Sequence, residues 1–236
     1  MKRNRFRTCL CLSFFFLSSL PLKAQDNQVS GLNASQFHKY WKVESESPDY
    51  KVTFRGDTAE IVSPKGLTLW RKEKMSGKVT IEYDACVVSE TEKDRLSDLN
   101  CFWMASDPKY PDNLWKREKW RNGIFLNCYS LQLYYLGYGG NHNSTTRFRR
   151  YDGNEAGITD PQARPAVLKE YTDAEHLLKA NHWYHIKITN ENNRVSYYID
   201  GKRLVDFRDA KPLTEGWFGF RTTLSHTRIT NFRYEC

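Results

Sequence analysis

The sequence predicts an all-β protein, folded as one antiparallel sandwich, on the basis of three observations. Short runs alternate between apolar and polar residues, as in 183–188 and 195–199, and this alternation places one face of a strand on a core. Turn signals such as Gly56-Asp57 and Asp200-Gly201 separate the runs, and Asp-Gly favours the tight turn of a hairpin. No long stretch has the period of an amphipathic helix, so we expect little helix.

The strands can be placed in chain order. The first short strands are expected to include Phe37, Tyr40, Trp41 and Val43. Residues 77–87 then give a clear strand with Val79 and Ile81 on one face and Glu82 and Asp84 on the other. One helical turn is expected at 173–178. The expected extended segments are 50–54, 59–62, 67–70, 77–87, 100–105, 123–138, 145–151, 167–171, 183–188, 195–199, 218–223 and 228–234.

The N-terminus has the pattern of a secretory signal peptide. Lys2, Arg3, Arg5 and Arg7 precede an apolar run at 10–22, and a small residue follows at Ala24. The run is too short to span a bilayer comfortably, so we expect an exported protein in the periplasm or outside the cell, off the membrane once the signal is cleaved. The expected domains are a signal peptide at 1–24, a flexible leader at 25–36 and one β-sandwich domain at 37–236.

The charge of the mature chain argues against nucleic acid as a partner. Residues 1–24 hold five of the 36 Lys and Arg and none of the 28 Asp and Glu, which leaves 31 (36 minus 5) against 28, a difference of +3. Nucleic-acid binding normally needs a pronounced basic stripe. Aromatic residues make up 14% of the chain, and Tyr and Trp combine an apolar body with a polar tip, which suits sugar rings as well as a sheet core.

Four cysteines follow the expected cleavage site, namely Cys86, Cys101, Cys128 and Cys236. Export permits disulfides, and four cysteines allow three pairings that the sequence cannot rank. Free buried thiols on strands are at least as consistent with the sequence. None of the four has C-x-x-C spacing, and no D-x-[DN]-x-[DN]-G loop is present. We therefore expect no metal or other cofactor, although a structural calcium ion stays open.

Hydrogen-bonding and charged residues gather at 134–152, around the glycine turn Gly139-Gly140. Glycine lets the backbone approach a ligand closely. The run 145–151 favours a strand, and its two-residue period then points Arg147, Arg149 and Tyr151 to one face. Two guanidiniums and a phenol on one face suit an acidic or hydroxyl-rich ligand. A solvated strand whose arginines pair with Asp or Glu is about as consistent with this run.

The long connection at 109–122 carries Trp115, Trp120, Arg117 and Arg121. Long ordered connections in compact domains are often binding loops, so we expect this one to wall the site. A loop whose tryptophans only cover the core is the alternative. Near the end of the chain, Arg221 or His226 is expected to approach the same cleft as Arg147 and Arg149, because the closing strand belongs to the same curved sheet.

A family resemblance adds to this interpretation. The run HWYHIKI…RVSYYIDGKRL…GWFGFRTTLSHTRITNF, which ends at Phe232, resembles the terminal strands of concanavalin A-like jelly rolls. Its spacing of Trp183, Ile186 and Ile188 is similar to that of laminin-G-like, YesU-like and keto-disaccharide hydrolase domains. With NCFWMASDP from Asn100, the resemblance covers most of the mature chain and is closest to the YesU-like family of the concanavalin A-like lectin/glucanase superfamily, which is linked to the breakdown of pectin and other uronate polysaccharides.

The resemblance implies two stacked antiparallel sheets, with a polysaccharide or oligosaccharide held on the concave face or at its rim. Enzymes of the glucanase branch resemble one another in a strand with the motif E-x-D-x-x-E, since retaining hydrolysis needs a nucleophile and an acid close together. Here only Glu82 and Asp84 are present, followed by Ala85-Cys86-Val87. We therefore interpret Glu82 and Asp84 as outward or structural acids. Retaining glucan hydrolysis is disfavoured.

β-Elimination from a uronate fits the residues better, because it needs groups that neutralise a carboxylate, a base and an acid. Arg147 and Arg149 serve the first role, His142 is the expected base, with His226 as the alternative, and Tyr138 or Tyr151 is the expected acid. The expected substrate-binding residues are Asn141, Asn143, Trp103, Trp115, Trp120, Arg121, Arg221 and His226. A lectin-like binding module would use the same residues, and hydrolysis of a glycoside or keto-glycoside is a third alternative. The sequence does not give the glycan, the linkage or the oligomeric state.

Overall fold

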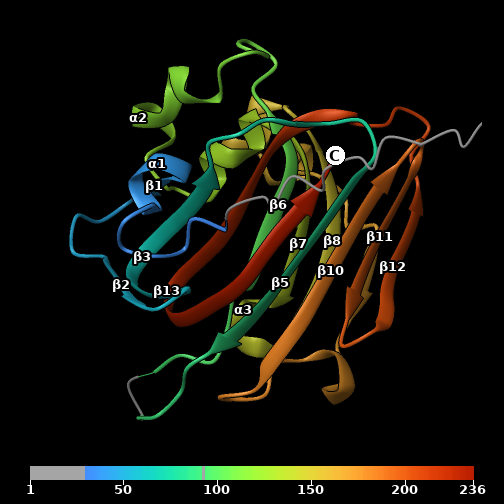
Figure 1. Ribbon diagram of the computed structural model, residues 1–236. Helices are drawn as coiled ribbons and strands as arrows, with labels where there is room; N and C mark the ends of the chain where they lie inside the picture. The colour runs from blue at the N-terminus through green and yellow to red at the C-terminus, as the bar shows by residue number, and fades with distance from the viewer. Residues whose placement is uncertain (1–29, 92–93) are drawn as a thin grey trace, which may run out of the picture.

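The computed structural model describes residues 30–91 and 94–236 and consists largely of antiparallel strands (Figure 1). It confirms the predicted fold class, an all-β sandwich of the jelly-roll kind. The strands are β1 (Trp41–Ser45), β2 (Lys51–Arg55), β3 (Thr58–Arg71), β4 (Met75–Ser76), β5 (Val79–Val87), β6 (Leu99–Ser106), β7 (Gln132–Gly139), β8 (Thr145–Asp152), β9 (Lys169–Tyr171), β10 (Trp183–Glu191), β11 (Arg194–Ile199), β12 (Lys202–Arg208) and β13 (Glu215–Glu235).

Helical structure is limited to short turns, as expected. The helical turns are α1 (Phe37–Tyr40), η1 (Leu114–Arg117), α2 (Glu118–Arg121), η2 (Leu126–Ser130), α3 (Gly140–Asn143), η3 (Glu155–Ile158), η4 (Pro161–Ala163) and η5 (Ala174–His176). The turn expected at 173–178 corresponds to η5, whereas Phe37 and Tyr40, expected in a first short strand, lie in α1. One expected extended segment is wrong in its first half: residues 126–130 form the turn η2, and only β7 is a strand.

Two strands, β3 and β13, connect the two layers of the sandwich. The first half of β13 pairs with β6, and its second half pairs with β5, while β3 follows β13 along both halves. The register shifts between Thr223 and Ser225, where Leu224 has a φ of +47°. An extra residue of this kind bends a strand. This bend carries the chain from one layer to the other.

The layers can be named by the strands they contain. The β6–β9 layer consists of β1, the second half of β3, the first half of β13 and β6 to β9. The β5–β12 layer consists of β2, the first half of β3, the second half of β13, β5 and β10 to β12. In Figure 1, β5 and β10 to β12 lie in front of β6, β7 and β8.

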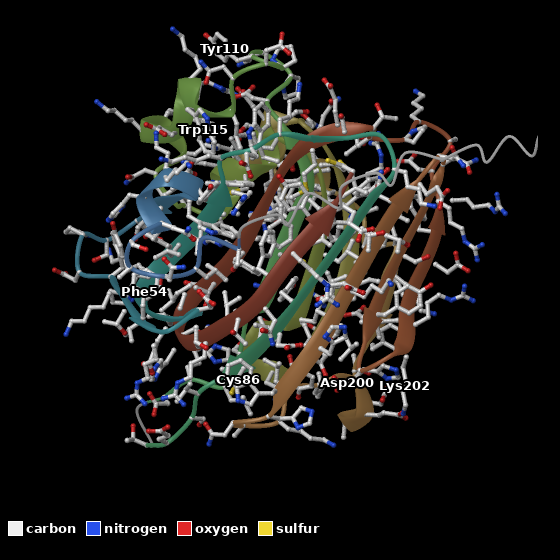
Figure 2. All side chains as sticks on the ribbon, viewed as in Figure 1. Phe54, Cys86, Tyr110, Trp115, Asp200 and Lys202 are labelled. Atoms are coloured by element: carbon white, nitrogen blue, oxygen red, sulfur yellow. The ribbon has the colours of Figure 1, made fainter. Side chains whose placement is uncertain are left out.

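Alternation along the strands divides the apolar residues between two clusters. On β7, Tyr134 and Leu136 belong to the large core between the layers, whereas Leu133 and Tyr135 belong to a second cluster on the other side of the β6–β9 layer. The connection 107–131 covers part of that side, since its Leu114 is buried in the second cluster. Figure 2 shows Tyr110 and Trp115 of this connection at one end of the sandwich, far from Asp200 and Lys202 at the other. The part of the side that the connection leaves uncovered is where the candidate site lies.

Several expectations concern the ends of the chain and the cysteines. The expected signal peptide and the first part of the expected leader lie outside the described residues. In the rest of the leader, Leu32 is fully buried against the sandwich. Cys86, Cys101, Cys128 and Cys236 are free thiols, and the first three are buried. In the ranges 30–91 and 94–236, no helix is long and apolar enough to cross a membrane.

Candidate functional site

A cavity of about 480 Å³ opens on the uncovered side of the β6–β9 layer. Five arginines line it, against two carboxylates, Glu46 and Asp98. We refer to it as the arginine cavity. The five arginines are Arg95, Arg147, Arg149, Arg164 and Arg221.

The floor of the arginine cavity follows from the register of four strands. Arg221 of β13 pairs with Asn100 of β6, Asn100 pairs with Gly137 of β7, and Gly137 pairs with Arg147 of β8. Directly paired residues point to the same face of a sheet, so these four side-chain positions form one row. Three strand spacings separate Arg221 from Arg147, which is roughly 14 Å at about 4.8 Å per strand. The glycine in this row has no side chain above the sheet.

A parallel row supplies the next arginine and a phenol. Phe102 of β6 pairs with Tyr135 of β7, and Tyr135 pairs with Arg149 of β8. The Tyr135 side chain lies along β7 toward Gly137, because a Cβ at Gly137 would be 2.2 Å from the Tyr135 hydroxyl oxygen. The absence of a side chain at Gly137 is therefore what allows the phenol to lie in the middle of the cavity.

Arg221 is held rigidly at one end of the cavity. Its side chain is only 3% exposed, and its Nη1 donates to the Gly123 carbonyl oxygen at 2.6 Å and to Thr68 Oγ1 at 3.4 Å. Its guanidinium carbon lies 5.5 Å from the centroid of the Phe125 ring. A Cβ at Gly66 would be 2.5 Å from Arg221 Nη2, so this glycine gives the guanidinium its space.

The arginines at the other end are held by the excursion between β8 and β9. Arg149 donates to the Pro165 carbonyl oxygen, and Arg164 Nε donates to the Gly157 carbonyl oxygen at 3.2 Å. Arg147 Nε donates to Glu170 Oε1 of β9 at 2.6 Å. These bonds use only some of the N–H groups of each guanidinium, which carries five in a planar fork. The remaining donors are available to a ligand.

The charges in the cavity are not balanced by its own carboxylates. Arg95 Nη1 pairs with Asp98 Oδ2 at 2.5 Å, and Arg147 pairs with Glu170. Throughout the described part of the chain, by contrast, Arg149, Arg164 and Arg221 form no ion pair. Three partly or fully buried cations without a carboxylate partner favour an anionic ligand, because burial makes an unpaired charge costly.

Two phenols next to these arginines keep their protons at neutral pH. Burial raises the pKa of Tyr135, and the nearby Asp98 charge adds to the rise, while Arg221 and Arg149 oppose it. Burial likewise raises the pKa of Tyr129, against the opposing effect of Arg149 and Arg164. Both groups can therefore donate a hydrogen bond or a proton, but they are poor bases.

The rim of the cavity is formed by the turn α3, which has an uncommon backbone. Asn141, His142 and Asn143 have φ values of +56°, +59° and +56°, and a left-handed conformation costs roughly 1–2 kcal/mol per residue except at glycine. Asn143 stabilises the turn, since its amide donates to the Leu178 carbonyl oxygen at 2.9 Å and accepts from the Leu178 N–H at 2.8 Å. Asn141 lines the cavity.

The structure thus brings four of the predicted site residues together, namely Arg147, Arg149, Arg221 and Asn141. Asn143 supports the rim without lining the cavity, and the other predicted residues lie elsewhere. His142 is exposed on α3 and does not line the cavity. His226 bonds to Glu60 Oε1 at 2.7 Å through its Nε2 atom, on the second half of β13.

Three predicted aromatic residues are buried instead of open to a ligand. Trp103 is 0% exposed in the main core, where it packs against Tyr134 and Phe148. Tyr138 also faces that core, and its hydroxyl donates to the Leu177 carbonyl oxygen at 3.2 Å. Tyr151 is on the same face as Arg149 but is 0% exposed, because the connection 107–131 covers it. In this structure none of the three contacts the arginine cavity.

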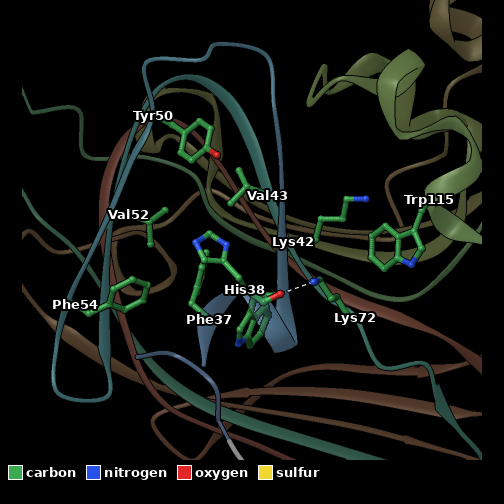
Figure 3. A pocket seen from close by; sticks show the side chains of 10 residues that line it. Phe37, His38, Lys42, Val43, Tyr50, Val52, Phe54, Lys72 and Trp115 are labelled. Carbon is green, nitrogen blue, oxygen red and sulfur yellow. Dashed lines mark hydrogen bonds between the residues drawn. The ribbon is translucent and has the colours of Figure 1, made fainter. Parts of the chain in front are cut away.

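The residues predicted on the long connection have different environments. Arg121 is 0% exposed and forms a buried ion pair, with its Nη2 at 2.8 Å from Glu44 Oε2. Trp120 is exposed, with the Arg117 guanidinium over its ring. Trp115 is half-buried and lines a separate concavity of about 580 Å³ at the edge of the sandwich. Figure 3 shows this concavity, with Lys42 extending toward Trp115.

Sequence reasoning missed several residues of the arginine cavity. Tyr135 is not among the predicted site residues, and neither is Asn100, which pairs with the glycine of the row. Arg95, Asp98 and Arg164 lie in loops whose return to the sheet has no local sequence signal. The register of β6, β7 and β8 was the available signal, since it aligns Asn100, Gly137 and Arg147.

The acids on β5 lie on the outer face of the β5–β12 layer. Glu82 pairs with Lys187 at 3.0 Å and with Arg233, and Asp84 pairs with His185 at 2.7 Å and accepts from Asn231. Over 30–91 and 94–236, no group of three His, Cys, Asp or Glu side chains could hold a metal ion.

Comparison with known proteins places the fold and the family. A carbohydrate-binding module from Bacillus subtilis, CBM66, superposes with a TM-score of 0.55 and 16% identity, covering 83% of this chain and 95% of that one. A Bacillus subtilis protein of unknown function with a galectin-like fold superposes with a TM-score of 0.68 and 15% identity, covering 87% of this chain and 93% of that one. An endo-β-1,3-glucanase from Pyrococcus furiosus superposes with a TM-score of 0.53 and 10% identity, covering 83% of this chain and 88% of that one.

These similarities show a concanavalin A-like fold. No curated protein matches the sequence. The family model described as a domain of unknown function, DUF6250, matches residues 61–232, which span β6, β7, β8 and nearly all of β13 and so most of the arginine cavity. The chain belongs to the DUF6250 family.

Proposed function

We propose that this protein acts on carbohydrate and binds an acidic glycan, of the uronate class, in the arginine cavity. The observation that carries the proposal is the set of three guanidiniums, on Arg149, Arg164 and Arg221, that line one cavity and have no carboxylate partner among the described residues. A guanidinium binds a carboxylate through two parallel hydrogen bonds, which fixes orientation as well as charge. The carbohydrate-binding module and the glucanase among the similar structures support a sugar as the carrier of that carboxylate.

The direct test is binding of uronate oligosaccharides by isothermal titration calorimetry. Arg149→Ala should weaken binding roughly tenfold to a hundredfold, because a hydrogen bond to a charged group contributes about 1.5–3 kcal/mol. Methyl-esterified oligogalacturonate, which lacks the charge, should bind wild-type and variant almost equally.

The matched control is Arg194→Ala. Arg194 lies on β11, pairs with Asp206 at 2.6 Å and is outside the cavity, so its removal should leave affinity unchanged. Equal losses for Arg149→Ala and Arg194→Ala would indicate a general charge effect and would contradict the proposal. Equal wild-type affinities for the esterified and the unesterified oligogalacturonate would contradict it as well.

A second candidate function, β-elimination, is favoured by the position of Tyr135. Its hydroxyl lies over Gly137, between the arginines, and its raised pKa keeps it protonated. Of the two carboxylates in the cavity, Asp98 is paired with Arg95, whereas Glu46 accepts a 3.3 Å bond from the Gly66 N–H. Glu46 is therefore the better base. Glu46 and Tyr135 replace His142, Tyr138 and Tyr151 in the proposed mechanism.

The step balances with these two groups. Glu46 takes the proton from the carbon next to the carboxylate, and the electrons of that C–H bond form the new double bond. The bond to the leaving oxygen breaks, and that oxygen takes the proton of Tyr135. The guanidiniums stabilise the charge that grows on the carboxylate, which lowers the barrier more than it tightens binding.

Elimination gives an ultraviolet-absorbing unsaturated product, whereas hydrolysis gives reducing ends without it. Tyr135→Phe and Glu46→Gln should each lower turnover by about a hundredfold or more while binding is retained. Tyr198→Phe, on the half-exposed part of β11 away from the cavity, is the control. If only reducing ends appear, without the unsaturated product, the protein is a glycoside or keto-glycoside hydrolase and not a lyase. Binding with neither product would leave a lectin-like module.

The remaining proposals concern location. We propose that residues 1–24 are removed as a signal peptide and that the mature protein works in the periplasm or outside the cell, where polymeric uronates are accessible. A YesU-like role in pectin or related uronate breakdown is consistent with this address and with the basic cavity.

A further inference from the structure

Two concavities, one of them the concavity beside Trp115, lie along β1 beyond the arginine cavity. The first, of about 400 Å³, shares Glu46 with the arginine cavity and extends past Ser45 and Ser47. The second, of about 580 Å³, shares Lys42, Val43 and Tyr50 with the first. The three concavities therefore form a series in which each neighbouring pair has lining residues in common.

We propose that this series is one groove, which binds a glycan chain of several sugar units running from the arginine cavity past Glu46 and along β1 to Trp115. The inference rests on the proposed function and deepens it, because it makes the ligand an internal stretch of a polymer instead of a single acidic sugar. We call the part beyond Glu46 the β1 groove. From Glu46 to Lys42, the chain rises roughly 13 Å at about 3.3 Å per residue.

The chemistry of the β1 groove suits sugar rings. Its far end presents half-buried Trp115, Tyr50 and Phe54, and such side chains combine an apolar ring surface with, in Trp and Tyr, a polar tip. Figure 3 shows Trp115 on one side and Tyr50 and Phe54 on the other, with the cavity between them. A ligand pocket typically pairs apolar walls with a few polar groups.

The far end of the β1 groove also carries positive charge. Lys42 lies 5.3 Å from the centroid of the Trp115 ring and pairs with Glu118. Lys72 is exposed and donates to the His38 carbonyl oxygen, and in the described residues it forms no ion pair. The arginines at one end of the whole series and Lys72 at the other match a chain with carboxylates on more than one unit, with Glu46 lying between them. Charge and continuity thus favour the same acidic glycan as the occupant, over a peptide or a second copy of the protein.

The experiment measures affinity against chain length. Oligogalacturonates and alginate oligosaccharides, from the disaccharide to the octasaccharide, are titrated into wild-type protein and into Trp115→Ala and Lys72→Ala. In wild-type protein, affinity should rise by roughly tenfold or more as the chain becomes long enough to pass Glu46. Trp115→Ala and Lys72→Ala should remove most of that gain and leave disaccharide affinity unchanged.

Two controls keep the result interpretable. Trp183→Ala removes another half-exposed tryptophan, on β10 away from the groove, and should keep the gain with length. Lys72→Ala guards against misfolding of Trp115→Ala, because Trp115 packs against Trp217 whereas Lys72 is exposed. If wild-type affinity does not rise beyond that for the disaccharide, the groove is overturned, but the arginine cavity remains as a binding site.

Other outcomes are equally decisive. If no oligosaccharide of either series binds, both the groove and the proposed function fail. If the protein is a dimer in multi-angle light scattering and Trp115→Ala makes it a monomer, a second copy occupies the β1 groove and the inference is wrong.

Discussion

At the scale of single residues, two arginines associated with Gly123, Arg221 and Arg121, have different roles. Arg221 donates to the Gly123 carbonyl oxygen and has no carboxylate partner in the described chain, so it suits an incoming anion. Arg121, two positions before Gly123, is already neutralised by Glu44. The sequence shows two comparable arginines, and only the positions of Glu44 and Gly123 in the folded chain tell them apart.

This distinction predicts a large stability effect at Glu44. Glu44→Gln leaves the fully buried Arg121 charge with only Asp107, whose Oδ2 lies 3.9 Å from Arg121 Nη1, and this loss should cost about 3–5 kcal/mol of unfolding free energy. Changing both residues, as Glu44→Gln with Arg121→Met, should recover much of the loss, because no unpaired charge then remains. Urea denaturation measures both. A Glu44→Gln cost no larger than that of the exposed-pair variant Arg194→Ala would show that the buried pair does not stabilise the fold.

At the scale of elements, periodicity predicts which side chains share a face but not which face is covered. The two-residue period correctly places Arg147, Arg149 and Tyr151 together, yet Tyr151 is buried because the connection 107–131 folds over its end of β8. The same period could have placed Tyr138 with Tyr134 on the core face. What strand patterns cannot show is how a distant loop returns to a sheet.

The segment between β12 and β13 illustrates such a return, and it predicts a pH effect. Asp209 accepts from Tyr134 of β7 at 2.7 Å and from Arg150 of β8 at 2.6 Å. Burial opposes its charge, but bonds from Tyr134, the Lys211 N–H and Arg150 outweigh burial and hold the pKa of Asp209 below its ordinary value.

A lowered folded-state pKa stabilises the fold above the unfolded-state pKa, which is about 3.9 for Asp. The stabilisation is then lost as the pH falls through the folded-state value. Asp209→Asn should therefore reduce the unfolding free energy at neutral pH and lose less of it on acidification below about pH 4. Asp112→Asn, at an exposed site, is the control. Parallel acid-unfolding curves for wild-type and Asp209→Asn would contradict this account.

At the scale of the whole molecule, the fold could be predicted from the sequence because many short alternating runs agree with one another. The C-terminal strands were the most readable, and the structure contains all of them. The arginine cavity could be predicted only in part. Its floor comes from strands whose period is visible, while Glu46, Arg95 and Arg164 come from loops that long-range folding brings to the sheet.

The whole account depends on where an acidic sugar binds, and a crystal structure of the protein with a uronate oligosaccharide measures this directly. We expect a carboxylate of the ligand to bond to the guanidinium of Arg149 or Arg221, with the rest of the chain passing Glu46 into the β1 groove. An oligosaccharide bound on the outer face of the β5–β12 layer, around Trp183, with water alone in the arginine cavity, would contradict the account.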